Sequence, residues 1–584
     1  MKRLVLLITV LCSSIAIAAQ DIPEHVAYTQ IYDFIDELAA DGIIEVNSAA
    51  KPYSRNFIAA KLQQAIQQRD RLTRRQQRDA VFYCNNYALE RDTIPTGILN
   101  YTNHKTFALT LLPPAFHYSD KHFKARITPI LGIMLTGNTN GLVIERRWGA
   151  NLEMDIVKHL SVWGSLRDIS FNGKHLRSSH GLNVSDARLS RPNYLNDLPG
   201  CQYKEAKYGG DYSDARYGIR AYTWWGSVGI AKDNVIWGDN YNGSNILSGR
   251  APSFPIITMH LTPVRWFELN YMHAWLVSNI IDSTSYYIEE TYTDSTSKRH
   301  YRLKNKFMAA TMMTFTPIPR LNISIGYSII YAENNIQLAY FTPIAFYKSI
   351  DHTLTKGVAT ENQNSQLFFN ISSRNIKHLH LYTSIYADEI NFKRLKKSNP
   401  QHNPISYKVG ACLSNWPIPN LSLQAEFTRT NSANYIHSIN AIAYTSNSYI
   451  LGHYLGPNAQ DIYVAISYKP IRGLYLKLSY TNDTKYNIYQ YVRSNITEII
   501  AQKPFNEKTW HNDIVAFKAV YEPFNNCYAT LNMAWNNASG YDLSSGTAIV
   551  GEIRGTAQQN NNRFSPRFYQ GQNFTIAAGF AFGF

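Results

Sequence analysis

The segment between residues 233 and 245 gathers side chains that suit sugar binding. It contains Trp237, Asp239, Asn240 and Tyr241 among glycines, and Arg250 follows shortly after. Aromatic rings pack against the C–H face of a sugar, while carboxylates and amides hydrogen-bond its hydroxyls. The composition therefore predicts a glycan-binding loop. Because Asn and Gly are also common in β-turns, a loop that is only rich in turns remains the alternative.

A second set of candidates consists of polar side chains on strands. Parity along the chain predicts that Glu268, His378, His380 and Glu426 point into the interior of a barrel. Two histidines separated by one residue on a strand can bind a metal, but no third ligand is identifiable. We therefore expect these histidines to be polar residues of the lumen, and we expect no metal or cofactor. The chain has no GxSxG or HExxH motif, and no Ser/His/Asp spacing marks a triad. We therefore expect a protein that is not an enzyme.

The elements that must position these residues are strands joined by tight turns. Turn signals recur along the chain at Lys158-His159, Trp225-Gly226, Pro263, Pro317, Arg374, Pro417, Pro470 and Pro523. Long segments separate one turn from the next. Tight turns at one end and long loops at the other are typical of a transmembrane β-barrel. Eight such turns separate nine strand pairs, which predicts a mainly β, antiparallel barrel of about 18 strands.

The strands carry a matching period of two. Leu474, Leu476 and Leu478 alternate with Tyr475 and Lys477, and similar alternation follows the other turns. Successive side chains of a strand point to opposite faces, so apolar residues would face lipid and polar residues the lumen. A large soluble β-sandwich or propeller gives the same alternation.

Both ends of the chain favour the membrane barrel. The chain ends on an amphipathic strand whose apolar face is Phe574, Ile576, Ala578, Phe580, Phe582 and Phe584. At the other end, residues 1–19 combine Lys2 and Arg3, a short apolar run and small residues at a cleavage position, which predicts a secretory signal peptide. Because an exported chain without a long apolar helix can cross lipid only as a closed barrel, we expect residues 103–584 to form one. The predicted location is the outer membrane of a Gram-negative bacterium.

Residues 25–92 have helical spacing and predict a small periplasmic domain. Tyr28 to Ala39 recur on one helix face, Gly42 ends that helix, and Ser54 can cap a second helix. Thr73 and Gln76 predict a capping box for a third helix, with Ala80, Val81, Cys84 and Tyr87 turned inward. The arginines Arg69, Arg71, Arg74, Arg75 and Arg78 predict a solvated helix face.

The net charge and the cysteine spacing of the chain limit the kinds of partner that it is expected to bind. The net charge of +15 predicts attraction to polyanions, and an exported barrel meets lipopolysaccharide and acidic surface polysaccharides rather than nucleic acid. Besides these, its partners include outer-membrane lipid. Cys84, Cys201, Cys412 and Cys527 show no metal-ligand spacing and are expected to be incidental thiols.

Two resemblances add expectations. The run from Tyr28 through residues 41–44 to residues 51–55 resembles an S-layer homology motif, which implies binding to cell-wall polymer such as peptidoglycan; a plug or docking bundle is the alternative.

A second set of segments resembles the Wzi family of capsule assembly proteins: residues 232–238, 246–255, 386–389 and 31–34. That resemblance implies an outer-membrane barrel with a periplasmic helical bundle that holds capsular polysaccharide as a lectin. A porin-like solute channel, anchored to the cell wall by its helical domain, is the alternative function.

Overall fold

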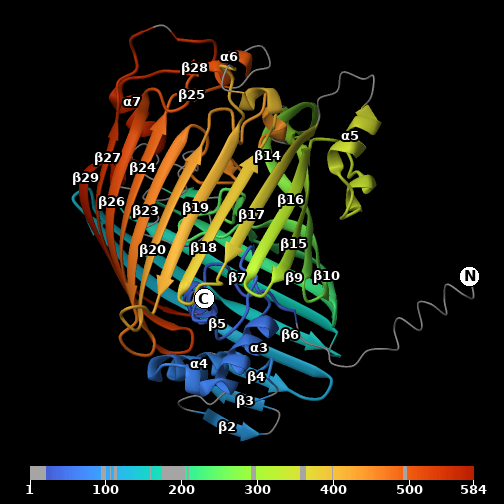
Figure 1. The fold of residues 1–584 in the computed structure, drawn as a ribbon, viewed down its shortest axis with the longest axis vertical. Coiled ribbons are helices and arrows are strands. Elements are labelled where there is room, and N and C mark those ends of the chain that lie inside the picture. The colour runs from blue at the N-terminus through green and yellow to red at the C-terminus, as the bar shows by residue number, and fades with distance from the viewer. Residues whose placement is uncertain are drawn as a thin grey trace, which may run out of the picture.

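Eighteen antiparallel strands of the protein close into a barrel (Figure 1). The structure, a computed structural model, describes residues 21–583 except 92, 94–99, 105–106, 111–114, 158, 174–203, 207–208, 291–296, 356–362, 397–398, 491–495 and 547. The predicted signal peptide, Lys158, Cys201 and Phe584 therefore lie outside the described residues. The barrel strands are β5 (Phe123–Asn138), β6 (Gly141–Ile156), β7 (Leu160–Asn172), β9 (Gly209–Thr223), β10 (Gly226–Asp233), β13 (Phe254–Val264), β14 (Phe267–Glu290), β15 (Ser297–Ile318), β16 (Leu321–Tyr331), β17 (Gln363–Ser373), β18 (Leu379–Ala387), β19 (Ile405–Ser414), β20 (Leu421–Thr430), β23 (Ala459–Tyr468), β24 (Leu474–Tyr486), β26 (Lys508–Phe524), β27 (Cys527–Gly540) and β29 (Gly571–Phe582).

The barrel closes between its last and first strands. β29 pairs with β27 on one side and with β5 on the other, in a register that places Phe580 opposite Ile133. Each of the eight predicted turn sites lies at or beside a tight connection between paired strands, all at one end of the barrel. The predicted fold class and strand number are thus confirmed.

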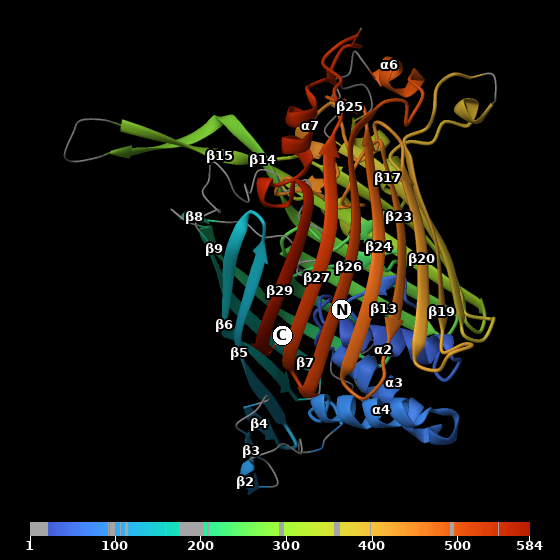
Figure 2. The same ribbon diagram turned by 90° about the vertical axis from the view of Figure 1, so that its left-hand side faces the viewer.

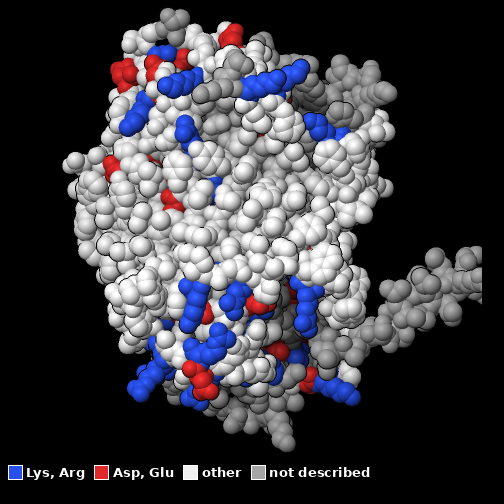
Figure 3. Space-filling model, viewed as in Figure 1, with Lys and Arg blue, Asp and Glu red and all other residues white. Residues whose placement is uncertain are grey.

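The outer wall is apolar where the alternation predicts it. Phe574, Ile576 and Phe580 of β29 are 46, 43 and 43% exposed, whereas Thr575 and Ala577 between them are fully buried toward the lumen. Figure 3 shows Lys, Arg, Asp and Glu gathered near the two ends of the molecule, with a band of few charges between them. Such a band is what a lipid-facing barrel wall requires.

Three short helices lie at the end of the barrel that carries the tight turns (Figures 1 and 2). They are α2 (Thr29–Ala40), α3 (Arg55–Gln67) and α4 (Arg74–Asn86). Ser54 caps α3, and Thr73 and Gln76 form the capping box of α4, as the sequence predicts. Two details differ. Val81 is 63% exposed rather than buried, and Arg75 is buried because it pairs with Glu37 and Asp79, while the other four arginines of the run are exposed.

Three segments fill the lumen among the described residues. The first is residues 21–54, which include α2 and the short strand β1 (Ala50–Lys51). The second is the connection between β10 and β13, with β11 (Ile236–Trp237) and β12 (Leu247–Ser248), and β1, β11 and β12 form one small sheet. The third is the connection between β20 and β23, from which the Tyr435 and Tyr444 hydroxyls donate to the carbonyls of Asn245 and Ile246. We call these three segments the plug.

Some elements lie outside the barrel ring. The strands β2 (Asn100–His104), β3 (Phe107–Thr110) and β4 (Phe116–Ser119) pair in series and extend the sheet from the start of β5. At the end with the long loops lie α5 (Tyr347–Thr355), α6 (Ile496–Ala501) and α7 (Ala557–Phe564). Of the helices described, none is long and apolar enough to cross a membrane.

Candidate functional site

The predicted sugar loop is folded into the barrel rather than displayed on its surface. Ile236 and Trp237 pair with Lys51 and Ala50 of β1, and Trp237 also pairs with Leu247. The indole of Trp237 is 4% exposed and lies 5.8 Å from the ring of Phe368. The stacking platform predicted at Trp237 is therefore unavailable to a sugar in this conformation, because β1 and the barrel wall cover it.

The neighbouring polar residues of the loop hold the plug together. Asp239 accepts hydrogen bonds from the Ser48 hydroxyl and, at 2.8 Å, from the Asn370 amide. The Tyr241 hydroxyl donates to Asp36 of α2 and lies 3.1 Å from Nδ1 of His380. A loop predicted to bind a ligand thus joins helix α2 to strands β17 and β18.

The loop candidates and the lumen candidates belong to one network. Glu426 on β20 accepts the backbone N–H groups of Tyr241 and Asn242 at 2.6 and 2.8 Å. It also accepts from the Tyr382 hydroxyl and forms an ion pair with Lys408 at 3.0 Å. Glu426 and Lys408 are both buried, so this carboxylate fixes the loop against the wall.

The remaining lumen candidates contact the N-terminal segment. Glu268 accepts from the amides of Asn47 and Asn270, each at 2.8 Å. His378 does not lie on a strand as predicted; it precedes β18 with a φ of 70°, and its Nδ1 is 2.8 Å from a carboxylate oxygen of Asp41. Because His378 sits in the turn, the two imidazoles have different partners, and His380 lies beside Ser372 and Tyr241.

Charge pairing holds α2 in the mouth of the barrel. Burial alone would raise the pKa of the Asp36 carboxyl, but the Arg374 guanidinium, together with His380 and Tyr241, holds that pKa well below its usual range. For Glu37, Arg75 and Lys469 overcome the effect of burial in the same way. The Asp33 carboxyl differs, because burial raises its pKa despite Lys469 and Lys477. Asp36 and Glu37 thus carry the anionic side of the contact between helix and barrel.

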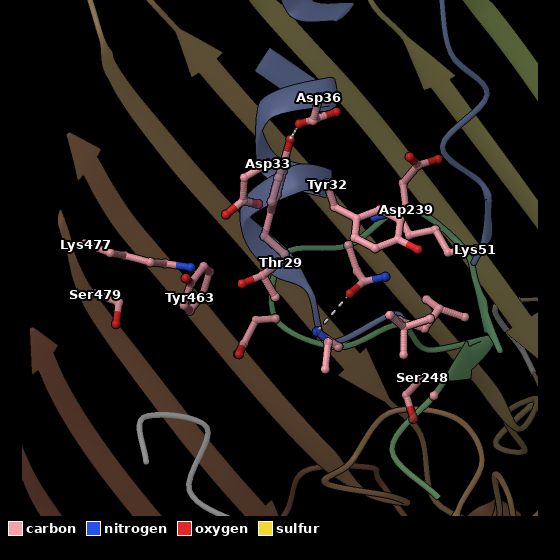
Figure 4. A pocket seen from close by; sticks show the side chains of 18 of the residues that line it. Thr29, Tyr32, Asp33, Asp36, Lys51, Asp239, Ser248, Tyr463, Lys477 and Ser479 are labelled. Carbon is pink, nitrogen blue, oxygen red and sulfur yellow. Dashed lines mark hydrogen bonds between the residues drawn. The ribbon is translucent and has the colours of Figure 1, made fainter. Parts of the chain in front are cut away.

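A polar cavity of about 250 Å³ remains between the plug and the wall formed by β23, β24 and β26. Figure 4 shows Lys477 and Tyr463 projecting from the wall toward Thr29 and Asp33 of α2, with Ser479 beside them. Of the predicted loop residues, Asp239, Asn240, Tyr241 and Arg250 line this cavity. The Arg250 guanidinium lies 4.3 Å from the ring centroid of Tyr454. The cavity therefore combines aromatic rings with ammonium, guanidinium and carboxylate groups.

Several residues of the site carried no sequence signal of their own. Lys51, Lys477 and Lys518 line the cavity, and Arg374 anchors the plug. The two wall lysines occupy polar positions of alternating strands, which predicts only that they face the lumen. Their convergence with α2 depends on how the plug packs.

An exposed aromatic and basic segment lies in the connection between β18 and β19. It is the short helix η4 (Phe392–Leu395), in which Phe392 is 78% exposed and Lys393 is also exposed. Asn391 caps it through the backbone N–H of Lys393, and the Arg394 guanidinium pairs with Glu389 at 3.2 Å. An exposed ring beside cations is a surface that suits an acidic sugar.

Comparison with known proteins finds solved structures to which this chain is similar. The Escherichia coli outer membrane protein Wzi, described as involved in group 1 capsule assembly and as a carbohydrate-binding β-barrel, superposes with a TM-score of 0.53 at 10% identity, covering 97% of this chain and all of that one. OccAB2 of Acinetobacter baumannii gives 0.41 at 10% identity over 80% and 99% of the two chains, and OprD of Pseudomonas aeruginosa gives 0.37 at 10% over 78% and 94%. No curated protein matches at the sequence level. The family model for the capsule assembly protein Wzi matches residues 199–548, more than half of the sequence, and the chain therefore belongs to the Wzi family.

Proposed function

We propose that this outer-membrane barrel binds capsular or another acidic surface polysaccharide and helps to hold it at the cell surface. Membership of the Wzi family and the shared barrel fold carry the proposal. The protein acts as a lectin and not as an enzyme, since the candidate residues Asp239, Glu426 and His380 are engaged in holding the plug.

The packing of the lumen favours binding over passage of solutes. A general channel needs an unobstructed lumen, and a barrel of this size would otherwise hold an aqueous channel. Here the plug occupies the lumen and is fixed to the wall through Asp36, Asp239 and the Tyr241 N–H, which donate to or accept from Arg374, Asn370 and Glu426. The porin-like alternative therefore requires the plug to move.

The site of sugar contact is proposed at η4, at the end of the barrel with the long loops. Phe392 offers a ring for stacking, and Lys393 and Lys396 offer exposed cations beside it. Since exposed charges are screened over about 8 Å at physiological ionic strength, binding of an acidic glycan should weaken as salt rises. The cavity residues Asn240, Tyr241 and Arg250 are the second proposed contact, for a sugar that reaches the lumen.

A paired set of variants tests this placement. Phe392→Ala with Lys393→Gln removes one exposed ring and one exposed cation. Ile344→Ala with Lys348→Gln is the matched control, because it removes an apolar side chain that is 73% exposed and an exposed cation in the segment that carries α5. We expect the first pair to weaken binding to purified acidic capsular polysaccharide by about tenfold, or ~1.4 kcal/mol, and the control to change nothing.

The outcomes separate the possible sites. Loss of binding in Arg250→Gln, with the η4 pair unaffected, would place the sugar in the cavity. Absence of binding by the unaltered protein to any surface polysaccharide on a glycan array would refute the proposed function. Capsule retained on cells, measured alongside the amount of folded barrel, checks the same variants in the envelope.

We call α2, α3 and α4, with the turns between them, the helical unit. It is proposed to lie in the periplasm, with cell-wall polymer as its further partner. Its arginines Arg69, Arg71, Arg74 and Arg78 are exposed, which suits contact with an anionic polymer. Co-sedimentation with isolated peptidoglycan, compared between the protein and a variant with these four arginines changed to Gln, tests this part.

A further inference from the structure

The two longest strands of the barrel continue beyond it as an arm. β14 and β15 remain paired up to Glu290 and Ser297, whereas their outer neighbours stop earlier, with Ile256 opposite Ala274 and Phe307 opposite Tyr331. From Trp275 to Lys306 no further strand of the barrel sheet pairs with the described hairpin, although residues 446–448 hydrogen-bond to Val277 and Asn279 at its base. Figure 2 shows this hairpin projecting sideways beyond the outline of the barrel, near the end with the long loops.

Irregular pairing explains why the arm leaves the barrel. The register shifts between Val277 and Ile281 and again between Asp282 and Tyr286, and Asn279 has a φ of 54°. Extra residues in one strand of a pair bend that strand and increase its twist. The bend therefore begins where the neighbouring strands end, and the arm turns away from the barrel axis.

The arm has one apolar face. Ile281, Tyr286 and Ile288 of β14 pair with Leu303, Tyr301 and Arg299 of β15, which places these six side chains on one face. The five apolar ones are 45 to 59% exposed. The Arg299 guanidinium lies 5.0 Å from the ring centroid of Tyr286. We call this surface the arm face.

The opposite face of the arm is polar. It carries Asp282 paired with Arg302, and Tyr287 stacked on His300 with ring centroids 4.9 Å apart. The hairpin is therefore amphipathic along its length. Gathering the apolar side chains on one face would not stabilise an arm that has water on both faces. Apolar area left in water costs roughly 25 cal/mol per Å².

The arm face continues the outer side of strand β15. β15 runs without a break from residue 297 to residue 318, and Met308, Ala310 and Met312 pack against the plug inside the lumen. By the period of two, Phe307, Leu303 and Tyr301 lie on the outer side. Phe307 packs there in a buried cluster with Tyr331 and Tyr340, whereas Leu303 and Tyr301 are exposed. When a strand bends away from the barrel axis at the top of the wall, its outer side turns down toward the membrane, and its inner side turns up toward solvent.

We propose that this arm lies on the outer leaflet of the outer membrane, with the arm face against lipopolysaccharide. Tyrosines and aliphatic side chains then sit at the level of the headgroups, as aromatic residues do at membrane interfaces. Arg299 provides the charge that complements the net negative charge of lipopolysaccharide phosphates. The arm widens the footprint of the protein on the membrane and leaves its polar face, with Arg302 and His300, directed away from lipid.

Two adjacent tyrosines provide a matched test. Tyr286 is on the arm face and Tyr287 is on the polar face, and they are 45 and 55% exposed. The photo-crosslinking residue p-benzoylphenylalanine is placed at either position in the full chain, and the protein is reconstituted in nanodiscs that contain lipopolysaccharide and phosphatidylethanolamine. Tyr301 and His300 form a second such pair, and heat-modifiable migration on gels verifies that each barrel is folded.

We expect lipid adducts at positions 286 and 301 at several times the yield at positions 287 and 300. Arg299→Gln should lower the yield at position 286 in lipopolysaccharide nanodiscs and leave it unchanged in nanodiscs of phosphatidylcholine alone. Equal lipid labelling of the two faces would overturn the proposal. So would adducts at position 286 formed with a second copy of the chain, or with added capsular polysaccharide, in place of lipid.

Discussion

The ion pair between buried Arg374 and half-buried Asp36 joins the helical unit to the barrel. Arg374 donates to Asp36 and also, at 2.9 Å, to the hydroxyl of Ser48, which in turn donates to Asp239. Removing one member of a buried ion pair leaves an uncompensated charge, which typically costs more than the pair contributes. The pair thus controls whether α2 remains seated.

We expect Arg374→Gln to destabilise the docked plug by at most about 3 kcal/mol, the lower end of the range for buried pairs, because the half-buried Asp36 carboxylate then lacks its cation. The double variant Asp36→Asn with Arg374→Gln should cost less. Hydrogen exchange of α2 measures the effect, with the exposed Arg69→Gln as a control expected within about 0.5 kcal/mol of the unaltered protein. An equally large loss in the double variant would show that shape rather than charge decides docking.

Asp388, just after β18, makes the stability of a loop contact depend on pH. This contact lies at the end of the barrel with the long loops. Burial raises the pKa of the Asp388 carboxyl to about 7, although the N–H of Tyr435 and the hydroxyl of Tyr386 hydrogen-bond it. A raised carboxyl pKa means that the folded state binds the proton more tightly than the unfolded state. The stability of this contact therefore falls as pH rises from about 4 to about 7, and is constant above that range.

Hydrogen exchange of residues 431–446, corrected for its intrinsic pH dependence, should be faster at pH 8 than at pH 5. Asp388→Asn should abolish this difference, since the amide carries no titratable proton. A difference that persists in the Asn variant would assign it to another group.

At the scale of the element, β29 is the strand on which closure depends. It supplies both the last pairing, with β5, and an apolar face toward lipid. Changing Phe574, Ile576 and Phe580 to Ser should block assembly of the barrel and leave export intact, as judged by loss of the heat-modifiable form in outer-membrane fractions.

The control for this variant is Leu338, Ile344 and Phe346 changed to Ser. These residues are 78, 73 and 50% exposed in the segment before α5, so apolar area is lost without altering a strand. Normal assembly of the β29 variant would mean that its outer face is dispensable for insertion.

The elements show how far the sequence could be interpreted. Turn residues and the period of two are local signals, and they predicted the strands, the tight turns and the helix caps at Ser54 and Thr73. The inward course of the connection after β10 was not predictable. Its Asp, Asn and Gly composition suits an outer loop equally well, and its partners, such as Glu426 and Asp36, lie about 200 residues away in the chain. The exposure of Val81 was not predicted for a similar reason. Helical periodicity does not tell which face of a helix packs against the barrel and which face stays exposed.

At the scale of the whole molecule, the plug should make the barrel a poor conductor. We expect lower ion conductance in planar bilayers for the unaltered protein than for a variant in which residues 236–248 are replaced by a short Gly-Ser linker, because β11 and β12 hold part of the plug in the lumen. Replacement of the exposed residues 544–546 by Gly-Ser-Gly is the control and should change nothing. Large, steady currents through the unaltered protein would support the channel alternative.

The contacts of the helical unit with the tight turns have a consequence for assembly. The unit contacts five successive turns, through Arg320, Arg374, Asn420, Lys469 and Asn525. These positions are fixed relative to one another only when the intervening hairpins are all present and in register, although the unit itself is the first described part of the chain to be synthesised. A barrel with one hairpin missing or slipped could satisfy some of these contacts but not all of them. The N-terminal helices therefore act as a gauge of the circumference of the barrel, and can seat fully only after the last strands have arrived.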